Sequence, residues 1–165
     1  MPNKICRTVF SALLALILIA VTATALPAQE EPKAFSAEEP IAHSAKIPAP
    51  IMSQLRRDPR VKQCVSRKNT IKSSWFSAAK IDLNGDQVDD YVVKARNPCL
   101  FGANLAPFWV FHNLTTRYSL VLRADALGLE ILPEKTEDYR NIKISRATAT
   151  DLSETVLKFD GAHYQ

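Results

Sequence analysis

Beyond Ser73 the chain alternates short apolar runs with turn-forming residues, and this pattern constrains the fold more than any other feature. Short apolar runs bounded by Gly, Pro, Asn and Asp are typical of β-strands. The connections between the runs are too short for crossover helices, so the sequence predicts a largely antiparallel, meandering sheet. The expected strands span residues 74–82, 90–95, 107–113, 118–124, 127–132, 139–148 and 154–160.

A helical pattern precedes the strands, over residues 50–65. Ile51 and Leu55 recur at the helical spacing of four, and Asp58 followed by Pro59 is typical of a new helix start. The sequence therefore predicts one or two short N-terminal helices packed on the sheet. The expected fold class is α+β and β-rich, with a single hydrophobic core.

The N-terminal fifty residues carry targeting signals and little that could build a core. A basic start, an apolar run over 11–21 and the small residues after it are typical of a cleavable signal peptide over 1–25. The apolar run is about a dozen residues, whereas a membrane-crossing helix needs roughly 20, so we expect no stable transmembrane anchor; the alternative is a short retained anchor. Residues 26–50 are rich in Pro and Glu, which predicts a disordered tether. We expect a periplasmic or secreted protein whose single globular domain spans 51–165.

The mature chain would keep a single pair of cysteines, Cys64 and Cys99. An even pair in an oxidising compartment predicts a disulfide. The alternative is a reduced, buried pair, while zinc would need more ligands than these two thiolates supply. A bridge closing this loop is expected to add on the order of 3 to 4 kcal/mol to the stability.

The segment 82–90 places oxygen-bearing side chains at alternate positions between two apolar runs. Calcium prefers several oxygen ligands, so this spacing predicts a weak, structural Ca²⁺ site. The alternative is an acidic, solvated turn held by hydrogen bonds from side chain to backbone. The expected ligands are the side chains of Asp82, Asn84, Asp86 and Asp90, with the carbonyl of Val88.

This run resembles the calcium-binding hairpin loops of the VCBS and FG-GAP repeat families, which carry a similar succession of Asp, Asn and Gly. A looser similarity extends over the aromatic run 108–111 and over the stretches 139–142 and 159–161. The resemblance implies a VCBS/FG-GAP-like domain fold and no defined activity. Gln87 stands where the family pattern usually has a glycine. A glutamine in the left-handed conformation would cost about 1 kcal/mol.

The residues that enzymes use for acid–base chemistry are sparse. His43 lies in the expected tether, His112 at the end of an aromatic strand and His163 near the C-terminus, without a nucleophile motif beside them. Asp89 and Asp90 are adjacent on an expected strand, so their side chains should point to opposite faces. We therefore expect no enzyme activity. The competing class is a cell-envelope hydrolase, which would need a deep pocket that combines His112 with acidic side chains.

Basic residues gather at the helical end of the domain. The cluster predicts a positive face that could contact an acidic protein, an anionic lipid surface or a cell-envelope polymer. The alternative is a solvated helix face. Its members are Arg56, Arg57, Arg60, Lys62, Arg67, Lys68 and Lys72.

A second candidate surface is the aromatic run 108–111, which is apolar without alternation. Such a run is typical of a strand buried on both faces, here between the helices and a second layer. An exposed Trp109 would instead indicate an interface anchor.

Taken together, these features favour a non-enzymatic binding module. The net charge of +4 is too small to indicate nucleic-acid binding. We expect the partner to be another envelope or extracellular protein, or a polymer. A sharper form of the same hypothesis is a periplasmic inhibitor or immunity protein that acts on a hydrolase. The sequence leaves the oligomeric state open.

Overall fold

The computed structural model describes residues 33–66, 70–102, 104–147 and 150–165. The predicted signal peptide lies outside these ranges, as do tether residues 26–32 and the cations Arg67 and Lys68. No helix within the described ranges is both long and apolar enough to cross a membrane.

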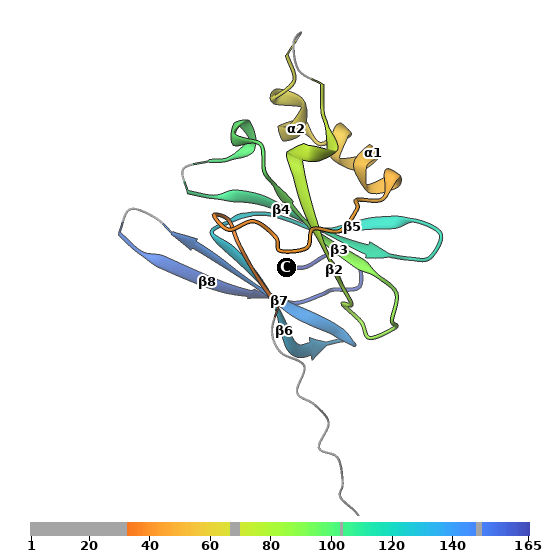
Figure 1. Cartoon of the computed structure of the whole chain (residues 1–165). Coiled ribbons are helices and arrows are strands. Elements are labelled where there is room, and N and C mark those ends of the chain that lie inside the picture. The colour runs from red at the N-terminus through yellow and green to blue at the C-terminus, as the bar shows by residue number, and fades with distance from the viewer. Residues whose placement is uncertain (1–32, 67–69, 103, 148–149) are drawn as a thin grey trace, which may run out of the picture.

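Two antiparallel sheets and two short helices make up the described chain (Figure 1). The central sheet has the strand order β2 (Phe76–Ile81), β3 (Asp90–Ala95), β4 (Ala106–Asn113) and β5 (Tyr118–Ala126). The outer sheet has the order β1 (Lys33–Ser36), β6 (Gly128–Thr136), β7 (Tyr139–Ala147) and β8 (Leu152–Leu157). The helices are α1 (Ala49–Arg57) and α2 (Pro59–Gln63). The predicted α+β, β-rich and antiparallel class is therefore confirmed.

The sequence predicts most strand positions closely but not how the strands pair. β3 matches the expected strand 90–95, whereas β8 begins and ends earlier than the expected 154–160. A single meandering sheet would pair β5 with β6. The chain instead leaves the central sheet at Leu127, whose N–H donates to the carbonyl of Ser145 in β7 at 2.8 Å. The expectation of one sheet was wrong, because apolar periodicity does not reveal which strands become neighbours.

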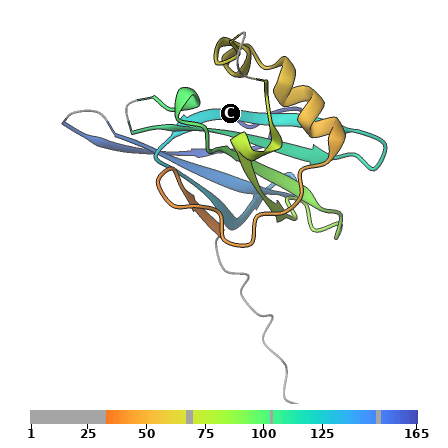
Figure 2. The same ribbon diagram turned by 45° about the horizontal axis from the view of Figure 1, so that its top comes forward.

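Strand β4 is buried on both faces, as its unbroken apolar run predicts. Phe108 and Val110 pack in the core between the two sheets, and Trp109 and Phe111 pack in the core beneath the helices. Figure 2 shows the resulting layers, with the helices on one side of the central sheet and the outer sheet on the other. Trp109 is only 1% exposed, so it is not an exposed interface anchor.

Residues 33–50 belong to the folded domain, so the prediction of a disordered tether was wrong for this part. β1 pairs with β6, and the N–H of Ala45 donates to the carbonyl of Ala78 at 2.8 Å. The ammonium of Lys94, which is 2% exposed, donates to the carbonyls of Ser36 at 2.7 Å, of Ala37 at 3.2 Å and of Glu39. A segment poor in apolar side chains is thus ordered by backbone pairing and by one buried cation.

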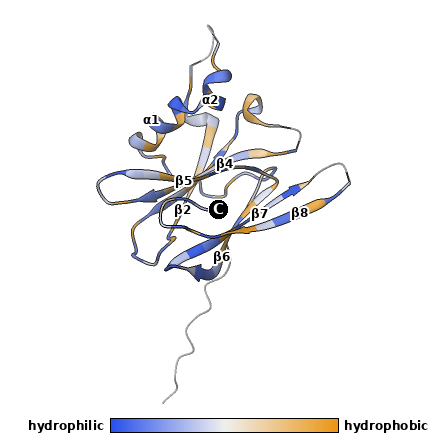
Figure 3. Cartoon of the chain, turned by 180° about the vertical axis from the view of Figure 1, so that it is seen from behind, coloured by the Kyte–Doolittle hydropathy of each residue, from blue (hydrophilic) through white to orange (hydrophobic). Residues whose placement is uncertain are grey.

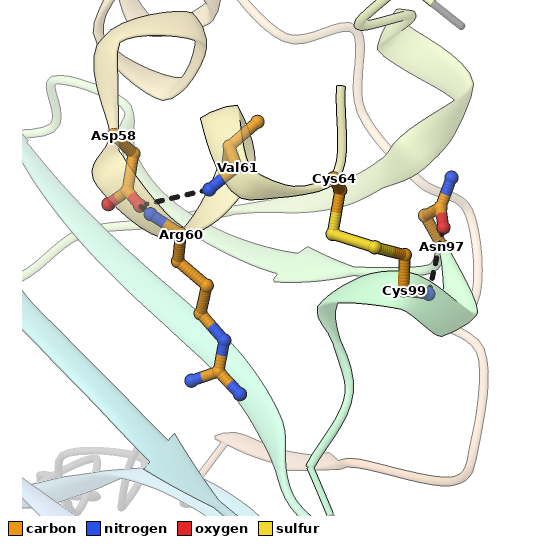
Figure 4. Close-up of a disulfide and its surroundings, with 6 residues drawn as sticks. All are labelled: Asp58, Arg60, Val61, Cys64, Asn97 and Cys99. Atoms are coloured by element: carbon orange, nitrogen blue, oxygen red, sulfur yellow. Dashed lines mark hydrogen bonds between the residues drawn. A yellow bond between two sulfur atoms is a disulfide. The ribbon is translucent and has the colours of Figure 1, made fainter. Parts of the chain in front are cut away.

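Two further predictions are confirmed: the break between the two helices at Asp58, and the disulfide. Asp58 caps α2, because its Oδ1 accepts the N–H groups of Arg60 at 2.9 Å and of Val61 at 3.3 Å. Cys64 then bridges to Cys99, with 5.8 Å between their Cα atoms (Figure 4). The bridge ties the end of α2 to the short turn that precedes β4.

The contacts of Lys94 predict what orders the N-terminal segment. Lys94→Met keeps an apolar stem but leaves the carbonyls of residues 36–39 without their donor, which should cost about 1 to 3 kcal/mol. We expect amide hydrogen exchange in residues 33–45 to accelerate at least tenfold while β4 stays protected. The measurement is exchange followed by mass spectrometry.

Lys80→Met is the matched control for this change. The Lys80 ammonium is exposed and pairs with the surface carboxylate of Asp89, so its loss should cost less than about 1 kcal/mol. Equal amide exchange rates of residues 33–45 in Lys94→Met and Lys80→Met would contradict the role assigned to Lys94.

The disulfide should stabilise the fold mainly by restricting the conformations of the unfolded chain. Cys99 is exposed and Cys64 half-buried, so replacing both with serine leaves no large buried hole. The bridge spans a sequence separation of 35 residues, and its loss should lower the free energy of unfolding by about 3 to 4 kcal/mol in denaturant titration. A reductant should destabilise the wild type by the same amount and leave the double variant unchanged. A wild type that is indifferent to reductant would contradict this prediction.

Candidate binding groove

The loop between β2 and β3 is closed by its own hydrogen bonds. The carboxylate of Asp82 accepts the N–H groups of Gly85 at 2.7 Å and of Gln87 at 3.0 Å. Asp86 accepts the N–H of Val88 at 2.7 Å and the amide of Asn84 at 2.9 Å. The Asn84 bond, followed by the Val88 bond, lowers the pKa of the Asp86 carboxyl. The acidic oxygens are thus engaged by hydrogen-bond donors, as in the turn that was the alternative to a calcium site.

Asp90, the last of the predicted calcium ligands, is buried at the start of β3. Its carboxylate is 1% exposed and accepts the N–H groups of Leu83 at 2.9 Å and of Asn113 at 2.7 Å. Burial raises the pKa of this carboxyl, although the two backbone bonds act against the shift. The first residue of β3 thus turns its side chain inward, and a calcium-ligand role for Asp90 stays a prediction of the sequence.

Across the described part of the chain, no group of three or more His, Cys, Asp and Glu side chains could hold a metal ion. Calcium binding by Asp82, Asn84, Asp86, Asp90 and the carbonyl of Val88 stays a prediction of the sequence. A rise in melting temperature on adding calcium would test it.

His112 lies in a buried polar network. Its Nδ1 is 2.9 Å from Asp90 Oδ1, and its Nε2 is 3.1 Å from the hydroxyl of Tyr139 in β7, so the network joins the two sheets. Asp89 points away from it and pairs with Lys80 at 2.5 Å, as expected for adjacent strand residues. None of the four hollows that we identify on the described surface is lined by His112. The contacts of His112 are those of a group that holds the sheets together.

The described members of the predicted basic cluster do not all behave alike. Arg56, Arg57, Lys62 and Lys72 are exposed, in keeping with the hydrophilic colour of the two helices in Figure 3. Arg60 is half-buried and forms an ion pair with Asp125 of β5. Among the described members of this cluster, Arg57 is the one that lines any of these four hollows.

Two adjoining hollows form a groove between α1 and the β4–β5 hairpin, which we call the arginine groove. They meet at Gln54 and Arg57, which line both. The smaller hollow has a volume of about 320 Å³ and is also lined by Leu55, Asp58, Pro59, Trp109, Phe111, Leu120 and Arg123. The larger has a volume of about 480 Å³ and is also lined by Pro50, Ser53, Asn113, Thr115, Thr116, Arg117 and Tyr118.

Helical spacing places one wall of the groove. Pro50, Ser53, Gln54 and Arg57 follow the spacing i, i+3, i+4 and i+7, so they share one side of α1. The helix is anchored beside this side by Ile51 and Leu55. Gln54 reaches across the groove and donates to the carbonyl of Tyr118 in β5 at 2.8 Å. The wall is therefore held in a defined position.

The only acid that lines the groove is Asp58, and its oxygens are already engaged. Oδ1 caps α2, while Oδ2 accepts the indole N–H of Trp109 at 3.0 Å. Arg123 Nε lies 3.5 Å from Oδ2, and the Arg123 side chain is still 44% exposed. Asp58 thus joins helix, strand and arginine in one contact.

The remaining arginines of the groove lack a carboxylate partner among the described residues. Arg57 donates to the carbonyl and hydroxyl oxygens of Ser53 at 3.2 and 3.3 Å, which positions the guanidinium without neutralising it. Arg117 is exposed and has no ion pair within the described ranges. The groove therefore carries three guanidiniums and one carboxylate.

Sequence reasoning found Arg57 but missed Arg117 and Arg123. These two residues lie at and beyond the hairpin connection, far in sequence from the basic cluster. The helical spacing of residues 50–57 could have indicated a shared side of α1. No local signal indicates that this side meets β5.

Gln87 adopts the left-handed conformation, with φ of 64°. Gln87→Gly removes the cost of a Cβ in this region and keeps the backbone bond to Asp82, so it should raise the free energy of unfolding by about 1 kcal/mol. Gln87→Ala keeps the Cβ and serves as the control. Denaturant unfolding of both variants is the measurement. A glycine variant no more stable than the alanine variant would contradict the expected strain.

Comparisons with protein-family models, with curated proteins and with solved structures find no match to this chain. The resemblance to VCBS and FG-GAP repeats therefore stays a prediction of the sequence.

Proposed function

We propose that this protein is a non-enzymatic binding module of the periplasm or the extracellular space, and that it holds another protein in the arginine groove. The observation that carries the proposal is the groove itself. It combines a recessed apolar floor, a wall fixed by α1 and three guanidiniums opposed by a single engaged carboxylate.

The chemistry of the lining favours recognition over catalysis. The described residues that line the two hollows include no histidine, cysteine, lysine or glutamate. The one titratable acid, Asp58, is committed to a helix cap and to Trp109. Arginine stays protonated at all ordinary pH values, so it binds anions well and moves protons poorly. These side chains suit a site that holds a partner without changing it.

The surroundings of the groove suit a preorganised contact surface. The floor belongs to the core under the helices, and the disulfide ties the end of α2 to the turn before β4. A surface that keeps its shape loses little conformational entropy on binding, which favours affinity. An inhibitor or immunity role would be a special case of such binding, recognised by loss of a hydrolase activity in the complex.

The experiment is capture of envelope and secreted proteins of the host by the full-length chain expressed with its own leader. The captured protein is identified, purified and bound again in isolation. Arg57→Glu with Arg117→Glu should weaken that binding at least tenfold, because both guanidiniums lose their anionic contacts and two negative charges enter the groove.

Lys62→Glu with Lys72→Glu is the matched control, since it makes the same charge change on exposed residues outside the groove. Its affinity should stay within about threefold of the wild type. Equal loss in both double variants would assign binding to the general charge of the helical end. Failure to retain any partner that binds again in purified form would overturn the proposed function.

A further inference from the structure

The guanidiniums of the arginine groove are spread along its length. Arg117 lines only the larger hollow, Arg57 lines both and Arg123 lines only the smaller. Arg117 immediately precedes β5 and Arg123 lies within it, so at most about 20 Å separates their Cα atoms, because the register shift in the β4–β5 pairing shortens the stretch. An extended peptide of about six residues covers that distance.

The chemistry along this line is that of a carboxylate receptor. Guanidinium forks bind carboxylates through paired hydrogen bonds, and Arg57 is already oriented by Ser53. The larger hollow adds the hydroxyls of Thr115 and Thr116, which can bond to a peptide backbone, whereas the Asn113 amide is already engaged by Asp89, Tyr118 and Thr115. β5 is the last strand of its sheet, but its carbonyls at Tyr118, Val121 and Asp125 already accept from Gln54, Tyr164 and Arg146. An extended segment would therefore lie along the groove without pairing with β5.

The smaller hollow adds an apolar position. Its walls include Leu55, Trp109, Phe111 and Leu120, and its volume of about 320 Å³ is at the lower end of the range for ligand sites. A single aliphatic or aromatic side chain can enter it and displace water from an apolar surface. A sulfated or phosphorylated polymer offers charge but no such side chain, and a flat lipid surface cannot reach a recessed floor.

We propose that the arginine groove takes an extended acidic peptide segment of the protein partner, with glutamate or aspartate carboxylates on Arg57, Arg117 and Arg123 and one apolar side chain in the smaller hollow. This inference rests on the proposed function and names the chemistry of its partner. Specificity comes from the two features together, because the charges orient the segment and the apolar side chain sets its register.

The test uses labelled synthetic peptides and fluorescence anisotropy with the disulfide-bonded protein at low ionic strength. The first probe has about eight residues, with glutamates on both sides of a single leucine. The second replaces the leucine with serine, and the third replaces the glutamates with lysines. The first probe should bind at least tenfold more tightly than either of the others.

Charge exchange provides the decisive comparison. The double variant Arg57→Glu with Arg117→Glu should bind the acidic probe at least tenfold more weakly than the wild type does. It should also bind the lysine probe more tightly than the wild type does, and an unfolded variant could not show this gain. The control variant Lys62→Glu with Lys72→Glu should rank the affinities of the three probes as the wild type does. An acidic probe that binds no better than the serine or lysine probes would overturn the inference. Equal competition by a sulfated polysaccharide or by anionic phospholipid vesicles through the same arginines would also overturn it.

The outcomes separate this inference from the proposed function. If the peptides fail while the arginine double variant still loses the captured protein, the groove binds that protein through other chemistry and only the peptide inference falls. If both the peptides and the capture fail, both proposals fall.

Discussion

Burial of strand β4 on both faces is the constraint on which the rest of this structure depends. Phe108 and Val110 need a layer on one side and Trp109 and Phe111 need a layer on the other. The outer sheet meets the first need and the helices meet the second. Neither layer could be lost without exposing large apolar side chains to water.

Buried charged groups then hold the layers in position. Lys94 fixes residues 36–39 through their carbonyls, Asp58 joins α2 to Trp109, and Asp90 joins the β2–β3 loop to His112 and Asn113. Each is costly to bury, and each is satisfied by several hydrogen-bond partners. Such groups favour one arrangement of the segments over its alternatives, because a shifted segment would leave a buried charge unpaired.

The arginine groove follows from the same packing. Ile51 and Leu55 set α1 on the central sheet, and the side of the helix beside them is left facing β5. Arg57 then lies in the same surface groove as Arg117 and Arg123, although it is at least 60 residues from either of them in sequence. Only one of the three belongs to the basic cluster that the sequence makes conspicuous, so the candidate site could be predicted only in part.

The sequence by itself determined the features that depend on near neighbours. These are the strand positions, the helix break at Asp58 and the double-sided burial of residues 108–111, since periodicity and caps act over a few residues. The pairing of Cys64 with Cys99 follows from the cysteine count, because the two residues are 35 positions apart. Tertiary structure alone decided the division into two sheets, the ordering of residues 33–50 and the assembly of the groove. These depend on the choice of strand partners and on contacts such as Lys94 with Ser36, 58 residues away. The contacts that stabilise these features form between segments distant in sequence, so no local stretch of the chain indicates them.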